Sequence, residues 1–194
     1  MHPATPQQDS PHSLGNRLAR AVWGVAWGVL VRPSPRFMHG WRNLVYRAFG
    51  AKIHRTARVY PTARVWLPSN LEMGEHACVG DRTDIYNVAP IRIGARSTVS
   101  HYSFLCAASH DFEDPAQPLT TAPITLGENV WLAADVFVAP GVTIPDGVVV
   151  GARSSVFASD LPAWHLCAGS PARAVRRREM RGSAGTGAVE QVRA

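Results

Sequence analysis

The 194-residue sequence has few cysteines and no long apolar run. No uncharged apolar segment approaches the ~20 residues that cross a bilayer, which excludes a polytopic membrane protein. The cysteines, Cys78, Cys106 and Cys167, form no CxxC pair and are odd in number, so neither a disulfide framework nor a cysteine-based metal site is expected. This cysteine usage favours a reducing compartment, the cytoplasm. Charged residues make up only 18% of the chain against 46% hydrophobic residues, which excludes a disordered chain.

The net charge of +6 is an average over three unlike regions. Residues 1–58 carry +8, residues 59–161 carry −6 and residues 162–194 carry +4. A protein that follows a nucleic acid backbone needs a basic central face, and here the centre is acidic. Nucleic acid is therefore not expected as a partner, and the two basic ends need another explanation.

An aliphatic residue recurs at every sixth position through most of the chain. The frame shifts by two residues after positions 70 and 90, and it breaks for fifteen residues at 111–125. A small or β-branched residue follows four positions after each aliphatic one, except at Asp160. The aliphatic positions are Ile53, Val59, Val65, Met73, Val79, Ile85, Ile93, Val99, Leu105, Leu126, Leu132, Val138, Ile144, Val150 and Val156.

A six-residue period fits neither a helix nor an alternating strand. It is typical of a parallel β-solenoid with three short strands per coil. We therefore expect an all-β fold over residues 53–161, with the aliphatic side chains inside and a loop insertion at 111–125. Glycine often follows the aliphatic residue, as at Gly74 and Gly80, where we expect a corner that needs a permissive backbone. The expected coils are 53–70, 73–90, 93–110, 126–143 and 144–161.

Residues 1–52 are expected to form an N-terminal tail and amphipathic helices that cap the solenoid. The expected apolar face of the helix nearest the solenoid consists of Trp41, Leu44, Val45, Ala48 and Phe49. An uncharged run at 21–31, with arginines at its ends, fits two interpretations. It is a helix packed on the cap or on another subunit, or an interfacial helix through which residues 17–32 contact an anionic membrane surface, on its inner, cytoplasmic side.

The chain after the solenoid divides into two parts. Residues 162–181 form a basic C-terminal segment, and the Gly/Ala-rich residues 182–194 are predicted to be a mobile tail.

Three stretches in the second half of the chain resemble the hexapeptide-repeat acyltransferases, whose fold is a left-handed parallel β-helix. They are LGENVW (126–131), APGVTIPDG (139–147) and CAGSPARAVRR (167–177). The segments YNVAPI (86–91), SHD (109–111) and RPSPR (32–36) are similar to the colanic-acid-type exopolysaccharide O-acetyltransferases, and nodulation, maltose and galactoside O-acetyltransferases are more distant. The resemblance implies acetyl-CoA as donor, a sugar or lipid-linked saccharide as acceptor, no metal, and a homotrimer with active sites between subunits.

His110 is the best candidate for a catalytic base, because it stands at the mouth of the insertion, where a loop is able to shape a pocket. From its position alone, a ring that only caps the turn is favoured, whereas the resemblance implies the general base. Asp111 either orients His110 or starts the loop turn. The resemblance places an acceptor-positioning amide near Asn87 and Tyr86, and the alternative is a corner amide that bonds its own backbone.

The remaining candidates concern the cofactor. Trp131 points outward from its repeat, and the resemblance implies that it packs beside the pantetheine arm or a neighbouring subunit. By the same resemblance, Ala133, Ala134 and Ala152 let the pantetheine lie along the solenoid wall. Arg173 and Arg176 match the phosphates of coenzyme A, unless the basic segment only confers solubility.

Two other functions remain open at this point. A zinc carbonic anhydrase on the same solenoid needs three convergent imidazoles, and the spacing of the histidines does not indicate such a set convincingly. The histidines considered are His54, His76, His101 and His110. A solenoid that only binds a ligand, without catalysis, is the other alternative.

Overall fold

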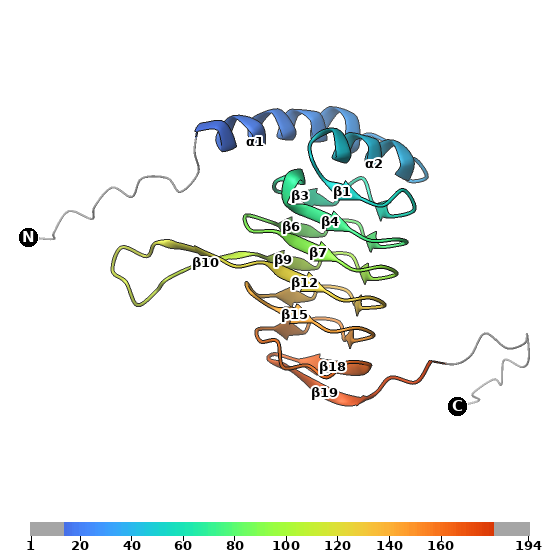
Figure 1. Cartoon of the computed structure of the whole chain (residues 1–194), viewed down its shortest axis with the longest axis vertical. Coiled ribbons are helices and arrows are strands. Elements are labelled where there is room, and N and C mark those ends of the chain that lie inside the picture. Colours follow the sequence, from blue (N-terminus) through green and yellow to red (C-terminus); the bar gives the residue numbers. More distant parts are fainter. Residues whose placement is uncertain (1–13, 181–194) are drawn as a thin grey trace, which may run out of the picture.

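The computed structural model describes residues 14–180 and is a parallel β-solenoid with helices across its N-terminal end (Figure 1). The predicted tail at 182–194 and the first thirteen residues lie outside the described part. Three sheets form the walls of a prism, and each coil adds one strand to every wall. The expected all-β solenoid is therefore confirmed.

The bounds of the strands follow the repeat. Sheet A contains β1 (Lys52–Ile53), β4 (Leu71–Met73), β7 (Ile91–Ile93), β12 (Ile124–Leu126) and β15 (Thr143–Ile144). Sheet B contains β2 (Arg58–Val59), β5 (Cys78–Val79), β8 (Thr98–Val99), β13 (Trp131–Leu132), β16 (Val149–Val150), β18 (His165–Gly169) and β19 (Ala172–Arg177). Sheet C contains β3 (Arg64–Val65), β6 (Asp84–Tyr86), β9 (Phe104–Cys106), β14 (Phe137–Val138) and β17 (Ser155–Val156).

The solenoid continues beyond the five predicted coils on one wall. Strand β18 pairs in parallel with β16, as a sixth coil would, and β19 then turns back antiparallel to β18. The predicted break at 111–125 is an antiparallel hairpin of β10 (Ala108–His110) and β11 (Leu119–Thr121), which projects from the prism (Figure 1). The fourth coil starts at Ile124, which is buried.

The interior consists of the repeated aliphatic residues. All fifteen are buried, none more than 5% exposed, so burial of apolar surface drives the stacking of the coils. The small residues four positions later are also buried at regular corners, where the Ser97 hydroxyl donates to the Gly127 carbonyl of the next coil. Ser69 and Ser109 are exposed because each lies at an interruption, the 3-10 turn η2 (Pro68–Asn70) and the hairpin.

The glycines that follow the aliphatic residues have a different reason from the predicted one. A Cβ at Gly74 would lie 2.7 Å from the Ala95 nitrogen of the next coil, and one at Gly80 would lie 2.9 Å from the His101 nitrogen. Close approach of successive coils therefore excludes a side chain there. The left-handed backbone occurs a few residues away instead, for example at Arg82 and Asn129.

The cap comprises α1 (Leu14–Ala26), the π-helix η1 (Trp27–Val31) and α2 (His39–Ala48). Among residues 14–180, no helix has both the length and the apolar character needed to cross a bilayer. Both α1 and α2 lie across the end of the prism (Figure 1), and α2 contacts β1 and β2.

Side chains of the cap close the open end of the solenoid. Backbone N–H groups of each coil donate to carbonyls of the next coil, as Arg58 does to Ala77, so the first coil is left with its own carbonyls unpaired. Five such carbonyls accept bonds from cap side chains. The pairs are Trp23 with Val65, Trp27 with Ala63, Arg42 with Val59, Asn43 with Ala57 and Arg47 with Ile53.

The predicted apolar face of α2 was therefore wrong for Trp41 and Leu44, whereas Val45 is buried as predicted. Trp41 is 39% exposed and Leu44 58% exposed, whereas Arg42 and Asn43 are buried against the first coil. The end of the solenoid needs hydrogen-bond donors, and this requirement outweighs the usual preference for apolar side chains inside.

Candidate active site

His110 ends the first strand of the hairpin that leaves the solenoid after the third coil. It lies opposite Leu119, and its side chain is exposed. Its Nδ1 lies 2.7 Å from the carbonyl oxygen of Gln117. Because a carbonyl only accepts hydrogen bonds, Nδ1 carries the proton, and the neutral ring keeps its lone pair on Nε2. The hairpin therefore presents a ring able to take a proton at Nε2.

The loop of the hairpin positions the Gln117 carbonyl. Gln117 has a positive φ of 46°, and its N–H donates to the Asp114 carbonyl. The Asp111 carboxylate accepts the N–H of Glu113 at 3.1 Å, which is an ordinary loop turn. Of the two roles left open for Asp111, the structure supports the turn, and Gln117 orients His110 instead. Sequence reasoning missed Gln117 because it acts through its backbone.

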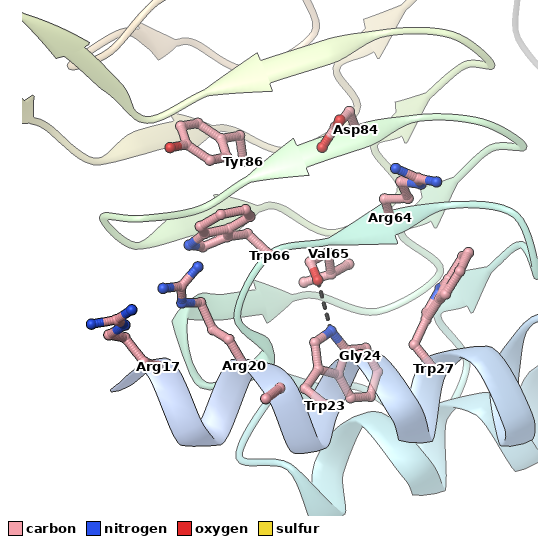
Figure 2. A pocket seen from close by; sticks show the side chains of 11 residues that line it. Arg17, Arg20, Trp23, Gly24, Trp27, Arg64, Val65, Trp66, Asp84 and Tyr86 are labelled. Carbon is pink, nitrogen blue, oxygen red and sulfur yellow. Dashed lines mark hydrogen bonds between the residues drawn. The ribbon is translucent and has the colours of Figure 1, made fainter. Parts of the chain in front are cut away.

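Asn87 and Tyr86 differ in what they offer to an acceptor. The Asn87 side chain is buried, and its amide bonds both the N–H and the carbonyl of Leu67 in the preceding coil. This matches the structural alternative for Asn87, a corner amide bound to backbone. Tyr86 is half-buried on the outer face of sheet C, with its ring 4.8 Å from that of Trp66 (Figure 2). Acceptor contacts of both residues stay predictions.

Trp131 lies on the outer face of sheet B, 48% exposed, and its indole N–H donates to the Ser100 hydroxyl. Register places Val149, Leu166 and Arg176 in one row with it on the same face. Three strand spacings separate Trp131 from Arg176, about 14 Å. The row therefore leads from the indole to a guanidinium at the C-terminal end.

A second row beside it consists of small residues. When the register of β13, β16 and β18 is continued by one residue, Ala133 lies beside Gly151, and Gly151 lies beside Ala168. Ala168 in turn pairs with Arg173 on β19. Ala134 and Ala152 follow at the corner between sheets B and C. These positions leave the wall low and smooth, so that a long flexible ligand could lie along it.

The C-terminal arginines make different contacts. Arg178 donates to the carbonyls of Asn129 and Gly147 and so fastens the end of the chain to the solenoid. Arg173 lies 3.5 Å from the Asp160 carboxylate, which explains the residue that broke the repeat rule. Arg176 is exposed and bonds only its neighbour's carbonyl among the contacts found within residues 14–180.

The predicted catalytic and cofactor residues lie at two different corners of one prism. His110 leaves the corner between sheets C and A, whereas Ala134 and Ala152 lie at the corner between sheets B and C. Sheet C separates them. Its outer face carries a ladder of aromatic rings with centroids 4.8 to 6.4 Å apart: Trp66, Tyr86, Phe104, Phe137 and Phe157.

A cavity that sequence reasoning missed lies on the same corner as the alanines, closer to the cap. It has a volume of about 670 Å³. Arg36 binds Asp81 at 2.7 Å, and Arg82 donates to the Tyr102 hydroxyl. Its lining of charged, hydroxyl and aromatic groups suits a polar ligand such as a sugar. The lining residues include Arg36, Tyr60, Thr62, Asp81, Arg82, His101 and Tyr102.

Within residues 14–180 of one chain, no group of three or more His, Cys, Asp or Glu side chains is arranged to hold a metal ion. Of the histidines considered for a zinc site, His54 and His76 lie at the corner between sheets A and B, and His101 and His110 lie at the two other corners. His54 and His76 belong to the first two coils, and His101 and His110 to the third.

No family model matches the chain. A comparison with curated proteins does find relatives. The chain is 44% identical over 164 residues to WcaF of Escherichia coli K12, an acetyltransferase named for colanic acid biosynthesis, and the match covers 84% of the chain and 90% of WcaF. The chain belongs to the hexapeptide-repeat acetyltransferases. The resemblance seen in the motifs is thereby confirmed, and the protein is an enzyme of the acetyltransferase class.

Other members of the acetyltransferase family are more distant. Galactoside O-acetyltransferase of Escherichia coli K12 is 28% identical over 70% of the chain and 68% of its own length. The solved structure of a galactoside acetyltransferase with coenzyme A covers 88% of the chain and 86% of its own, with a TM-score of 0.79 at 24% identity. A maltose O-acetyltransferase from Clostridium difficile 630 has a TM-score of 0.78 at 22% identity, covering 87% and 90%. These structures share the fold.

Proposed function

We propose that the protein transfers an acetyl group from acetyl-CoA to a hydroxyl of a sugar, in exopolysaccharide synthesis, with His110 as general base. The observation that carries the proposal is the His110 ring, which donates from Nδ1 to the Gln117 carbonyl and leaves Nε2 as the base. The name of the 44% identical relative supports the polysaccharide context, and the coenzyme A complex of the galactoside acetyltransferase supports the donor.

The reaction is a direct transfer. His110 Nε2 takes the proton of the sugar hydroxyl while its oxygen attacks the thioester carbonyl. The C–O bond forms, the C–S bond breaks, and the proton passes from His110 to the departing thiolate. A covalent enzyme intermediate is disfavoured because the Cys106 thiol donates to the Ala108 carbonyl rather than pairing with His110.

Acetyl-CoA would lie along the corner between sheets B and C. The thioester would lie near Trp131 and Ala134, and the phosphates near Arg173 and Arg176 at the C-terminal end, where guanidinium groups suit phosphate oxygens. The sugar would occupy the cavity beside Asp81 and Tyr102, on the same corner but nearer the cap. In this placement the thioester end of acetyl-CoA faces the sugar along the same corner.

His110 of the same chain lies at a different corner, so the proposed active form is a homotrimer. If sheet C of three copies faces a threefold axis parallel to the solenoid, the corner with His110 of one copy meets the corner with Ala134 of the next. The aromatic ladder on sheet C would be buried around the axis. Three sites result, each built from two chains. The contact predicted between residues 17–32 and a membrane does not depend on this reaction.

The first test is His110→Ala, with acetyl transfer to a sugar acceptor as readout. We expect a loss of about 10²- to 10⁴-fold in kcat with unchanged stability, because the side chain is exposed. His54→Ala, another exposed histidine, is the matched control and should keep full activity. Near-normal turnover by His110→Ala would overturn the base assignment.

The second test examines the shared site. Two differently tagged chains, one with His110→Ala and one with Ala134→Trp to block the donor, are co-expressed and trimers that carry both tags are purified. One of the three sites then combines an intact base with an intact donor corner, so about a third of the wild-type activity should return. No recovery, or full activity from a monomer, would contradict the trimer.

A further inference from the structure

The helical cap turns its apolar side away from the solenoid. Along α1 and η1, five aliphatic residues recur at spacings of four, four, three and four, which places them on one face. Their exposed fractions range from 51% to 81%. The residues of this outer face are Leu14, Leu18, Val22, Val25 and Val29.

Helix α2 extends the same surface. Trp41 and Leu44 are exposed, and the Trp41 indole N–H donates to the Leu30 carbonyl, which joins α2 to η1. The polar side chains of the cap point inward because they bind the carbonyls of the first coil. Hydrogen bonding to these carbonyls explains the polar inner face of the cap. It does not explain the apolar outer face, because contact with water would favour polar residues there. A contiguous apolar surface of this kind is typical of a contact with a partner or a membrane.

The charged side chains on the helices that carry this surface are all basic. Residues 14–71 contain ten Lys and Arg and no Asp or Glu, and the first acid after them is Glu72. Three of the ten, Arg17, Arg20 and Arg64, lie beside a cavity of about 690 Å³ between α1 and sheet C, which Asp84 also lines. Figure 2 shows Arg17 and Arg20 projecting from α1 on the side nearer the solenoid, and the Arg20 guanidinium lies 4.5 Å from the centre of the Trp66 ring.

We propose that the outer face of α1, η1 and α2 docks on a bilayer with anionic headgroups, with α1 in the plane of the membrane. The aliphatic side chains would enter the boundary of the acyl chains, and the arginines on the flank of α1 would lie at the level of the phosphates. A second copy of the chain is a poorer occupant, because two cap ends of the same positive charge repel each other.

This docking also bears on the proposed reaction, on which the present step rests. In the proposed trimer all three caps lie at the same end of the threefold axis, so three helices would contact one membrane together and strengthen binding. His110 lies at the third coil, two layers below the first, about 10 Å. A saccharide carried on a lipid would therefore reach the site from the membrane.

The test is flotation of the full-length protein with vesicles of phosphatidylethanolamine and phosphatidylglycerol in a ratio of about 3:1, against vesicles of phosphatidylcholine alone. We expect binding to the anionic vesicles, weakened severalfold by high salt. The double variant Leu18→Glu/Val25→Glu should bind at least about tenfold more weakly, and it should fold normally because both residues are exposed. Val175→Glu, with a valine of similar exposure at the opposite end, is the matched control.

Four results would overturn the proposal: no flotation of the wild type, equal and salt-insensitive binding to both vesicles, equal binding by the double variant, or binding lost by Val175→Glu to the same degree. If the wild type does not bind vesicles and the variant Leu18→Glu/Val25→Glu forms a smaller oligomer than the wild type, the occupant of this face is a second copy of the chain. Flotation requires no turnover, so an inactive His110→Ala protein that still floats separates failure of the reaction from failure of docking.

Discussion

At the cap end of the solenoid the unpaired backbone groups are carbonyls, whereas at the C-terminal end they are N–H groups. The carbonyls of the first coil accept bonds from side chains of the cap, such as Arg42 and Trp23. At the other end, the N–H of Gly151 donates to the backbone carbonyl of Cys167 on β18, and the N–H of Thr143 donates to the Ser159 hydroxyl.

The difference follows from which groups a protein can supply. The five carbonyls of the first coil lie on three walls of the prism and point to separate places, so each needs its own hydrogen-bond donor. Long side chains with N–H groups can reach them. An N–H edge can be closed by the next piece of backbone, so a short strand is enough. The cap end therefore uses Arg42, Arg47 and two tryptophans to bind carbonyls of the first coil, while the C-terminal end leaves Arg176 exposed.

The largest effect is expected when the cap end loses its central donor. Arg42→Met leaves the buried carbonyl of Val59 and the carbonyls of Pro35 and Arg36 without this partner, so the free energy of unfolding should fall by about 3 kcal/mol or more. Denaturant unfolding measures it. Arg47→Met, on the same helix, removes one bond near the surface and should cost under about 1 kcal/mol. Equal losses would mean that closure of the edge is not what stabilises this end.

Two tryptophans refine the same point. Trp23→Phe removes the donor to the buried Val65 carbonyl and should destabilise by about 1 to 3 kcal/mol. Trp27→Phe removes the donor to Ala63 at a half-buried position, where water can replace it, so a smaller loss is expected. Thermal unfolding of the two variants side by side compares them. The reverse order would contradict this account.

At the C-terminal end the expected loss concerns binding. Arg176→Ala should raise KM for acetyl-CoA about tenfold, with little change in kcat or melting temperature, because the guanidinium is exposed and would contact phosphate. Arg55→Ala, an exposed arginine in the first coil, is the control and should leave KM unchanged. A drop in stability with unchanged KM would assign Arg176 to structure.

The smallest effect concerns pH at the cap. Burial, with the positive charge of Arg42, lowers the pKa of His39 below its usual value near 6.5. The unfolded chain then binds more protons than the fold, so this contribution to stability is present above that value and is lost as the pH falls below it. His39→Gln keeps an acceptor for Arg42, and its unfolding free energy should vary less between pH 5 and about 6.5 than that of the wild type. Parallel curves would exclude His39 as the cause.

Local patterns predicted more of the solenoid than of the cap. All fifteen aliphatic residues that the six-residue period selected are buried, because each strand repeats the same short-range environment. The period did not predict the sixth layer at β18, where the antiparallel strand β19 replaces the repeat. On α2, periodicity selected Trp41 and Leu44 for the interior, since apolar spacing contains no information on the carbonyls that the helix must meet.

The candidate site divides in the same way. His110 could be found because it interrupts a repeat at the only long break in the pattern. The group that orients it, the Gln117 carbonyl, could not be found from residue types, because every residue has a carbonyl and only the hairpin decides which one is near. The cavity around Asp81 and Tyr102 escaped notice for a related reason, since its residues come from three coils and are ordinary corner residues in each.

The sequence by itself determined the coil register, the core and the candidate base, because these depend on neighbours a few residues apart. Only the tertiary structure decided which sides of the helices face inward, and that the candidate base and the candidate donor wall lie at two corners of one prism. The physical reason is hydrogen bonding over long separations. The carbonyls of Val65 and Val59 lie 42 and 17 residues from Trp23 and Arg42, the side chains that bind them, and no local pattern specifies that match.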